Sequence, residues 1–465
     1  MRTLYVAALA ALAACASADQ LDDFIKSEMA RQNVPGLTLA IVRDGKVVRT
    51  GAYGKADLEL DVPANEDNVF EIGSTTKQFT AVLVLQQLEE GKLSLEDPIS
   101  KYIEGSPATW NGITLRHLLT HTSGLKEYVV IPGLGLIEEF DRKTFLEKMK
   151  PLTLDFQPGE TFAYSNTNFA LLGVVLEKVS GKTYTELINE RILKPLEMTN
   201  TQILDPDAVV KNRAHGYMNQ GGKLFRSRLS MLSNLSDGAL MSTAKDLAKW
   251  DIALHGGKVL KPASFQLLTT PAKLNTNRPR PYGLGTFLSP LGARPFIGHH
   301  GASAGYSVGY GHFPSANLAV IVMTNVYAIN GQQIVTSIAE IIDPNLKVTP
   351  PAEKPDPSKD RTEKVKAALV KLAANDPDEA TLEPEMTAPM KTDRGRMGAG
   401  PYAILKTLDG MTFLNEEAYG ADRLLTYRLS TPTRNFIARI VWTANNKISE
   451  IALRADGAPK SPSVR

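Results

Sequence analysis

Apolar stretches near the two ends of the first 350 residues predict β-strands. Residues 36–54, GLTLAIVRDGKVVRTGAYG, hold two β-rich runs joined by Asp44-Gly45, a dipeptide that favours a tight hairpin turn. Residues 305–325 hold two more runs, GYSVGYGHF and NLAVIVMTN, separated by a short turn. We expect strands from both regions to pair in one antiparallel sheet.

The segment between these strands has helical periodicity. Gly91 and Gly181 provide helix stop signals, and the predicted helices cover residues 76–90, 168–179, 184–193 and 243–254. This order predicts an α/β (α+β) domain, in which an antiparallel sheet flanked by helices carries an inserted all-helical subdomain. We expect a cleft between the sheet and the helical subdomain.

A change in composition divides the chain. Residues 347–364, KVTPPAEKPDPSKDRTEK, are rich in Pro and charge and predict a linker after a main domain at 19–346. The remainder, residues 365–465, predicts a small α+β domain of unknown role. Its expected elements are a helix at 365–374 and strands at 424–429, 436–442 and 448–453.

The first 18 residues predict export. MRTLYVAALAALAACASA has one Arg, an apolar run and small residues, which is typical of a signal peptide. The apolar run is short for a membrane span. Cleavage after Ala18 and lipidation of Cys15 within LAAC stay open as two processing routes. We therefore expect a periplasmic or secreted protein, or a membrane-anchored lipoprotein.

The composition of the chain and two incomplete sequence motifs exclude several functions. With 52 Lys and Arg against 50 Asp and Glu, the net charge is +2, which provides no electrostatic footprint for nucleic acid. Cys15 is the only cysteine, so cysteine-based nucleophiles and metal sites are excluded. His117 and His121 lack the Glu of a zinc-binding H-E-x-x-H motif, and SGKT at 180–183 lacks the first Gly of a phosphate-binding loop. We expect no metal and no cofactor.

Two serines are candidates for a nucleophile. Ser303 lies in G-x-S-x-G at residues 301–305, the pattern of an α/β-hydrolase nucleophile elbow. That fold requires a helix after the serine and later an acid and a His, whereas the residues after 305 alternate like a strand and only His312 follows. Ser74 lies where strand-like residues end and an apolar helix begins. We therefore prefer Ser74.

Ser74 and Lys77 form an S-x-x-K pattern on one helical face. A serine hydroxyl attacks only when a base takes its proton, and a Lys amine can act as that base when burial disfavours its charged form. The helix N-terminus also provides partial positive charge and N–H groups for a developing oxyanion. Taken alone, Ser74 also fits an ordinary helix N-cap.

Two further segments supply the remaining groups. Tyr164 and Asn166, within Y-S-N before a predicted helix, offer a proton-transferring hydroxyl and an amide for substrate. The segment 299–301, His-His-Gly at the start of an edge strand, is expected to line the opposite wall of the cleft. There the backbone N–H of Ala302 would pair with that of Ser74 as an oxyanion hole.

The order S-x-x-K, Y-x-N, H-x-G resembles that of the penicillin-recognising serine hydrolases, which include class C β-lactamases, D-alanyl-D-alanine carboxypeptidases and related esterases. The resemblance extends over about residues 20–345 and includes three connecting phrases, ITLRHLLTHTSGL (113–125), KPLEMTNT (194–201) and DGALMSTAKDLAKW (237–250). It implies a β-lactamase/transpeptidase-like fold and catalysis without a cofactor.

The resemblance also implies roles for individual residues. Ser74 corresponds to the nucleophile, Lys77 to its base partner, Tyr164 to the general base or proton relay, and Asn166 to a substrate contact. Whether Lys77 or Tyr164 takes the serine proton stays open. His299 stands where the β-lactamase pattern K-T-G has Lys, and together with Gly301 and Ala302 it would contact substrate. Loss of the Lys charge favours a peptidase or esterase over a β-lactamase.

The sequence therefore predicts an exported serine hydrolase that forms an acyl-enzyme on Ser74. Its partner would be a small-molecule or peptide acyl substrate: an ester, a D-amino-acid peptide or a β-lactam. The alternative is a cell-envelope penicillin-binding or sensor module that is acylated without turnover.

Overall fold

The computed structural model describes residues 19–135, 138–205, 207–227, 235–289, 291, 294–327, 329–392 and 402–457. The predicted signal peptide at 1–18 and the candidate lipidation site Cys15 lie outside the described residues. No described helix is both long enough and apolar enough to cross a bilayer.

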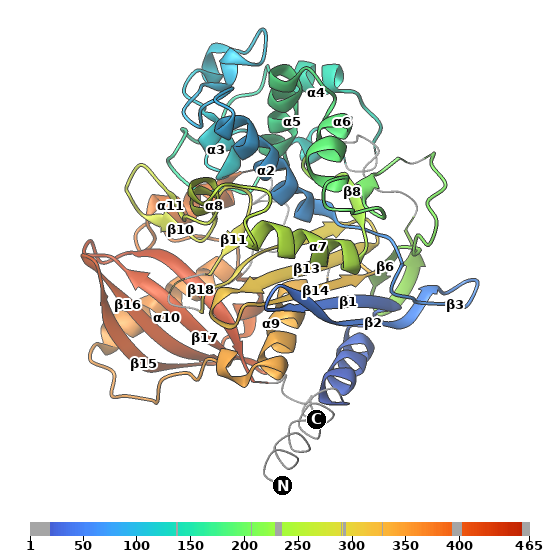
Figure 1. The fold of residues 1–465 in the computed structure, drawn as a ribbon. Coiled ribbons are helices and arrows are strands. Elements are labelled where there is room, and N and C mark those ends of the chain that lie inside the picture. The colour runs from blue at the N-terminus through green and yellow to red at the C-terminus, as the bar shows by residue number, and fades with distance from the viewer. Residues whose placement is uncertain are drawn as a thin grey trace.

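A seven-stranded antiparallel sheet forms the centre of the main domain (Figure 1). Its order is β11-β12-β13-β14-β1-β2-β3, so strands from both ends of the domain pair as the sequence predicts. Asp44 and Gly45 join β1 to β2 with φ of 52° and 70°, the left-handed values of a tight hairpin turn. The strands are β1 Gly36–Arg43, β2 Lys46–Asp57, β3 Val62–Pro63, β11 Phe287–Leu288, β12 Ile297–Ser303, β13 Tyr306–Phe313 and β14 Leu318–Thr324.

Both faces of this sheet are buried. In β1, Leu39 and Ile41 pack in the core that includes α9 (Gly331–Ile342) and the helix at 19–32. Ala40 and Val42 point the other way, into the core that includes α2 (Thr76–Glu89) and α7 (Ala244–His255). Because strand side chains alternate between faces, a strand covered on both sides needs a continuous apolar sequence. Figure 1 shows α7 and α9 on opposite faces.

The helical subdomain is inserted between β4 and β8 and lies above the α7 face of the sheet (Figure 1). Three predicted helices are present with small shifts at their ends, whereas the helix predicted at 184–193 becomes α6 followed by a π-helical turn at Asn189–Leu193. The other helices are α3 Leu115–Leu119, α4 Arg142–Met149, α5 Asn166–Ser180, α6 Tyr184–Ile188 and α8 Pro262–Leu268. The short strands are β4 Phe70–Glu71, β5 Gln202–Ile203, β6 Tyr217–Gln220, β7 Lys223–Arg226, β8 Leu240–Ser242, β9 Ala272–Lys273 and β10 Pro279–Arg280.

The C-terminal domain is a four-stranded antiparallel sheet with α10 in its core. Its elements are α10 Lys359–Ala373, α11 Pro384–Lys391, β15 Gly410–Tyr419, β16 Asp422–Ser430, β17 Asn435–Trp442 and β18 Ile448–Asp456. The three predicted strands are present. The expected helix start at 365 is wrong, because α10 begins inside the segment predicted as a linker. Residues 359–364, KDRTEK, are mostly good helix formers and extend the helix backwards.

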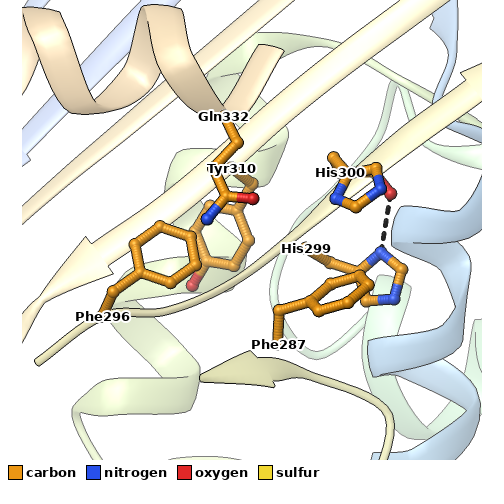
Figure 2. A pocket seen from close by; sticks show the side chains of 6 residues that line it. All are labelled: Phe287, Phe296, His299, His300, Tyr310 and Gln332. Carbon is orange, nitrogen blue, oxygen red and sulfur yellow. Dashed lines mark hydrogen bonds between the residues drawn. The ribbon is translucent and has the colours of Figure 1, made fainter. Parts of the chain in front are cut away.

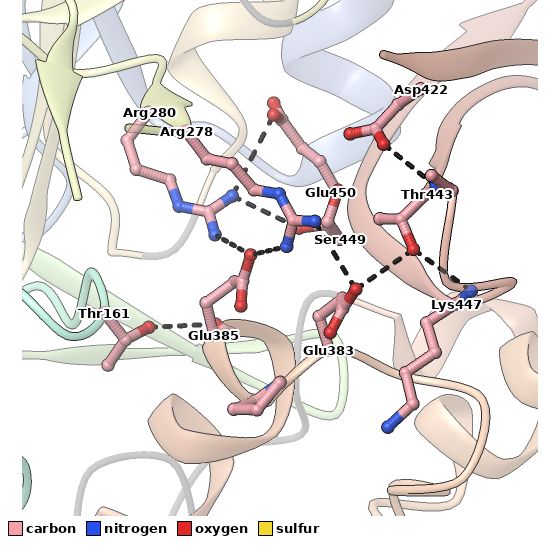
Figure 3. A network of polar contacts seen from close by, with 12 residues as sticks. Thr161, Arg278, Arg280, Glu383, Glu385, Asp422, Thr443, Lys447, Ser449 and Glu450 are labelled. Atoms are coloured by element: carbon pink, nitrogen blue, oxygen red, sulfur yellow. Dashed lines mark hydrogen bonds and ion pairs between the residues drawn. The ribbon is translucent and has the colours of Figure 1, made fainter. Parts of the chain in front are cut away.

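A buried polar network joins the two domains (Figure 3). Arg278 and Arg280, at β10, face Glu385 of α11, with which Arg278 forms an ion pair. The Arg280 guanidinium lies 3.8 Å from Glu385 and 3.9 Å from Glu450 of β18. On the helical side, Thr161 donates a hydrogen bond of 2.9 Å to the backbone carbonyl of Glu385. The C-terminal domain therefore contacts both the β10 segment and the segment that precedes Tyr164.

Candidate active site

Ser74 lies in a sharp turn between a strand and a helix. β4 ends at Glu71, the 3-10 turn η1 covers Gly73–Thr75, and α2 begins at Thr76. Gly73 has φ of 47°, and a Cβ there would lie 2.5 Å from the carbonyl oxygen of Ala302. Other residues are strained in this conformation, and the approach of Ala302 leaves no room for a Cβ, so glycine is required here. The turn therefore places Ser74 directly beside β12.

Lys77 is fully buried in the first turn of α2. α2 is buried on nearly all sides, so the protein surrounds it and its apolar residues do not form a single stripe. The Lys77 ammonium nitrogen Nζ lies 3.1 Å from Ser74 Oγ, 2.7 Å from Asn166 Oδ1 and 2.8 Å from the Asp237 backbone oxygen. The S-x-x-K pair thus meets the Y-S-N segment, as the sequence predicts.

The contacts of Lys77 fix the orientation of its amine. The Asn166 carbonyl and the Asp237 carbonyl can only accept, so each takes one N–H of Nζ. The remaining tetrahedral position of Nζ points to Ser74 Oγ. In the neutral amine that position holds the lone pair, which can take the serine proton. In the ammonium form it holds an N–H that donates to Oγ.

Tyr164 lies over the same group. Lys77 Nζ is 5.0 Å from the centroid of the Tyr164 ring, and that ring packs against His121 at 4.2 Å and against Phe287 at 6.1 Å. Ser74, Tyr164 and Asn166 are all partly exposed, whereas Lys77 is not. The structure therefore brings the predicted nucleophile, base partner and proton relay to one partly open site.

β12 forms the opposite wall of this site. β11 pairs only with residues 297–298 of β12, so from His299 onwards this edge of β12 faces η1 instead of a strand. A Cβ at Gly301 would lie 1.9 Å from the carbonyl oxygen of Ile72, which shows how closely the two backbones approach. Ser74 and Ala302, which carry the two predicted oxyanion N–H groups, therefore lie on adjacent segments.

His299 is buried and uncharged in this wall. Its Nδ1 donates 2.7 Å to the carbonyl oxygen of His300 (Figure 2). Its Nε2 lies 3.1 Å from the hydroxyl of Tyr282. Burial, with the nearby charges of His300 and Lys77, lowers the pKa of His299 well below its usual range. The histidine therefore supplies no positive charge where the β-lactamase pattern has Lys.

A small pocket beside His299 is largely aromatic. Figure 2 shows Phe287 next to both imidazoles of β12. The Phe287 ring lies 4.9 Å from that of His299 and stacks on that of His300 at 4.7 Å. Because Phe287 also stacks on Tyr164, one aromatic surface runs from Tyr164 to this pocket. The pocket is lined by Phe287, Phe296, His299, His300, Tyr310 and Gln332.

Ser303 has a different environment. Its side chain is buried and donates 2.5 Å to Glu71, which also forms an ion pair of 2.8 Å with Arg213. Ser303 is followed by β13 and not by a helix, so the strand–turn–helix arrangement of a nucleophile elbow is absent at this serine. The hydroxyl joins β12 to β4 instead.

Asp237 and Glu127 are two residues of the site that no sequence motif singled out. Glu127 accepts the backbone N–H of Asn166 at 3.0 Å, and the Asp237 carboxylate accepts the Tyr128 hydroxyl at 3.1 Å. Burial raises the pKa of Asp237 to about 6. The charge of Lys77 opposes this rise in pKa, whereas the charge of Glu127 adds to it. The only sequence signal was that Asp237 begins one of the three connecting phrases.

Two groups of side chains elsewhere come close enough to be considered as metal ligands: Asp251, His255 and His312, and Asp57, Glu59 and His215. In the first group the two imidazole rings stack at 3.5 Å with an angle of 6°. Metal-binding lone pairs lie in the ring plane, so those of two parallel stacked rings cannot meet at one ion. Asp251 instead accepts from Tyr310 at 2.8 Å and from His312 at 3.0 Å.

The second group is partly exposed, and His215 Nδ1 lies 3.0 Å from Asp57.

His117 forms a capping box with Thr114 at the start of α3, whereas His121 is buried beside Tyr164. The two histidines of HLLTH therefore have separate structural settings.

Comparison with known proteins identifies the family. The family model described as Beta-lactamase matches residues 21–335. The chain belongs to the beta-lactamase family. Protein flp from Staphylococcus aureus (strain NCTC 8325 / PS 47) is 31% identical over 239 residues, which cover 50% of this chain and 48% of Protein flp. This chain therefore spans about half the length of Protein flp. The putative penicillin-binding protein PbpX from Bacillus subtilis (strain 168) is 32% identical over 292 residues, 62% of this chain and 70% of PbpX.

Solved structures show that the family fold is shared. A penicillin-binding protein from Bacillus halodurans matches with TM-score 0.60 and 26% identity, covering 68% of this chain and 98% of that one. A D-stereospecific amidohydrolase from Streptomyces sp. matches with TM-score 0.57 and 27% identity, covering 66% and 93%. The octameric penicillin-binding protein homologue from Pyrococcus abyssi covers 95% of this chain and 99% of its own, with TM-score 0.61 and 23% identity, and so shares the fold across both domains.

Proposed function

We propose that the protein is an exported serine hydrolase that cleaves amides or esters, including those of D-amino acids, through an acyl-enzyme on Ser74. The observation that carries the proposal is the orientation of Lys77. Two carbonyl acceptors hold its amine so that the third position faces Ser74 Oγ at 3.1 Å. A nucleophile held against its base in this way is the signature of covalent catalysis.

The reaction follows from these positions. Ser74 Oγ attacks the acyl carbonyl and its proton passes to Lys77 or Tyr164, which returns a proton to the leaving amine or alcohol. The N–H groups of Ser74 and Ala302 stabilise the oxyanion. Water then attacks the acyl-enzyme, and the same base takes the water proton and passes it to Ser74 Oγ as the C–Oγ bond breaks, which releases the acid product and restores the hydroxyl.

The substrate preference rests on the opposite wall. A β-lactam carries a carboxylate that a Lys in the K-T-G position would bind, and the neutral His299 offers no such charge. The aromatic surface of Tyr164, Phe287 and His300 suits an apolar side chain on the acyl group. Similarity to the D-stereospecific amidohydrolase from Streptomyces sp. supports amides of D-amino acids as the first class to test.

A parallel panel tests the proposal. The purified protein receives a chromogenic β-lactam, a D-Ala-D-Ala peptide, D- and L-phenylalanine amide, and short-chain nitrophenyl esters. We expect steady turnover of an ester or D-amide, slower or absent turnover of the β-lactam, and complete loss of turnover in Ser74→Ala. A single stoichiometric burst with every substrate would instead support the sensor module. Unchanged turnover in Ser74→Ala would refute the nucleophile.

A further inference from the structure

The hydroxyl of Tyr282 bridges the two walls of the cleft. Tyr282 follows β10 and precedes β11 in the chain, and its side chain is buried. Its hydroxyl oxygen lies 3.2 Å from His121 Nε2 and 3.1 Å from His299 Nε2. His121 belongs to the helical subdomain, whereas His299 belongs to β12 of the sheet. Each of these three side chains is at most 1% exposed, so water does not compete for the bonds.

The partners of His121 determine its tautomer. Its Nδ1 accepts the backbone N–H of Ser165 at 3.2 Å, and a backbone amide can only donate. Asn168 adds a second donor at 3.1 Å, because its own oxygen already accepts the hydroxyl of Ser123 at 2.6 Å. Nδ1 is therefore unprotonated. In the neutral ring the proton is on Nε2, and it is donated to Tyr282.

The partners of His299 determine the opposite tautomer. Its Nδ1 faces the backbone oxygen of His300 at 2.7 Å, and a carbonyl oxygen can only accept. The ring proton of neutral His299 is therefore on Nδ1, and its Nε2 accepts from the Tyr282 hydroxyl. The bonds run in one direction, from the Ser165 amide through His121, Tyr282 and His299 to the His300 carbonyl.

His121 also holds the segment that carries Tyr164. Its backbone is in the left-handed region at φ of 56°, which is uncommon for a residue other than glycine and costs free energy unless its surroundings enforce it. In this conformation its carbonyl accepts the N–H of Ala163 at 3.0 Å while its ring accepts that of Ser165. One residue thus fixes both neighbours of Tyr164, and its ring packs against the Tyr164 ring at 4.2 Å with an angle of 34°.

We propose that Tyr282 is a positioning residue that locks the two cleft walls together through opposite tautomers of His121 and His299. One wall carries Tyr164, and the other carries the Ala302 amide. The inference deepens the proposed function and rests on it for its kinetic consequence. The tautomer pattern itself is independent of any substrate.

The kinetic test is Tyr282→Phe, which keeps the ring and removes both bonds. Because a shift of about 1 Å in a catalytic group costs on the order of 100-fold in rate, we expect kcat to fall about 10- to 100-fold. KM should stay within about threefold, since the lost contacts align the reacting groups and do not touch substrate. Tyr427→Phe is the matched control: that tyrosine is fully buried in the C-terminal domain, its hydroxyl lies 3.1 Å from Thr362, and kcat should not change.

The spectroscopic test uses protein labelled with ¹⁵N in its seven histidines. Signals assigned with His121→Gln and His299→Gln should show an Nε2–H tautomer for His121 and an Nδ1–H tautomer for His299 from pH 6 to 9. Both should shift in Tyr282→Phe. The same tautomer in both rings, or unchanged kcat in a folded Tyr282→Phe, would overturn the inference. If the wild type turns over no substrate while the tautomers are as stated, the proposed function fails and the bridge stands.

Discussion

Gly301→Ala tests how closely β12 must approach the nucleophile turn. A Cβ at this position would lie 1.9 Å from the carbonyl oxygen of Ile72, and such contacts are essentially never shorter than 3.0 Å. The two backbones must therefore separate by about 1.1 Å. That movement carries the next amide, Ala302, away from the oxyanion position. Both a 1 Å misplacement and the loss of one oxyanion donor cost on the order of 100-fold in rate.

We therefore expect kcat/KM for a nitrophenyl ester to fall about 100-fold in Gly301→Ala, with about 1–3 kcal/mol lost in the free energy of unfolding. Two controls separate the effects. Gly36→Ala creates a similar clash, 2.1 Å from the carbonyl of Lys55 on β2, outside the cleft, and should lose stability but keep its activity within about threefold. In Gly112→Ala the added Cβ would lie 3.9 Å from its nearest neighbour, so this variant should keep both its activity and its stability. Activity above one third of wild type in Gly301→Ala would refute the close approach.

Three further predictions concern other groups. Ser303→Ala should keep most acylation activity, measured as the ester burst, but lower the free energy of unfolding by about 1–3 kcal/mol because Glu71 loses a buried donor. Asn166→Ala should lower kcat at least about 10-fold in the same assay, since Lys77 loses the acceptor that orients its amine. Burial raises the pKa of Glu450 from 4.5 to about 7, so ionising it destabilises the folded state as pH rises from 4.5 through 7. Glu450→Gln should match wild type in chemical denaturation at pH 4.5 and be more stable by up to about 3 kcal/mol at pH 8; equal stability at both pH values would contradict this.

Local sequence signals predict the long strands of the central sheet and the turn that carries Ser74, but not the short strands β3 and β11. Asp44-Gly45 predicts the β1–β2 hairpin because few dipeptides adopt two left-handed residues. Ser74 and Lys77 are one helical turn apart, so the covalent chain itself brings them together. Periodicity also predicts the region of α5, where a Gly181 C-cap with φ of 69° marks the end.

Other elements have no local signal. β15 was not predicted because its sequence, GMTFLNEEAY, mixes polar and apolar residues, and an irregularity in pairing between Phe413 and Asn415 breaks the alternation. Asp237 and Tyr282 reach the site from segments far from Ser74 in sequence. Their contacts depend on how the helical subdomain packs against the sheet. The pattern of apolar residues within one segment does not predict such packing between distant segments.

The arginine-rich contact of Figure 3 has a consequence for the independence of the domains. Arg280 is buried, and two residues further along the chain is Tyr282, while Thr161 stands three residues before Tyr164. Removing the C-terminal domain would leave the Arg280 guanidinium without Glu385 and Glu450 and would release both segments at once. The C-terminal domain thus supports the segments that hold Tyr164 and Tyr282, and a shortened chain or a domain exchange would change the shape of the cleft as well as the stability of the fold.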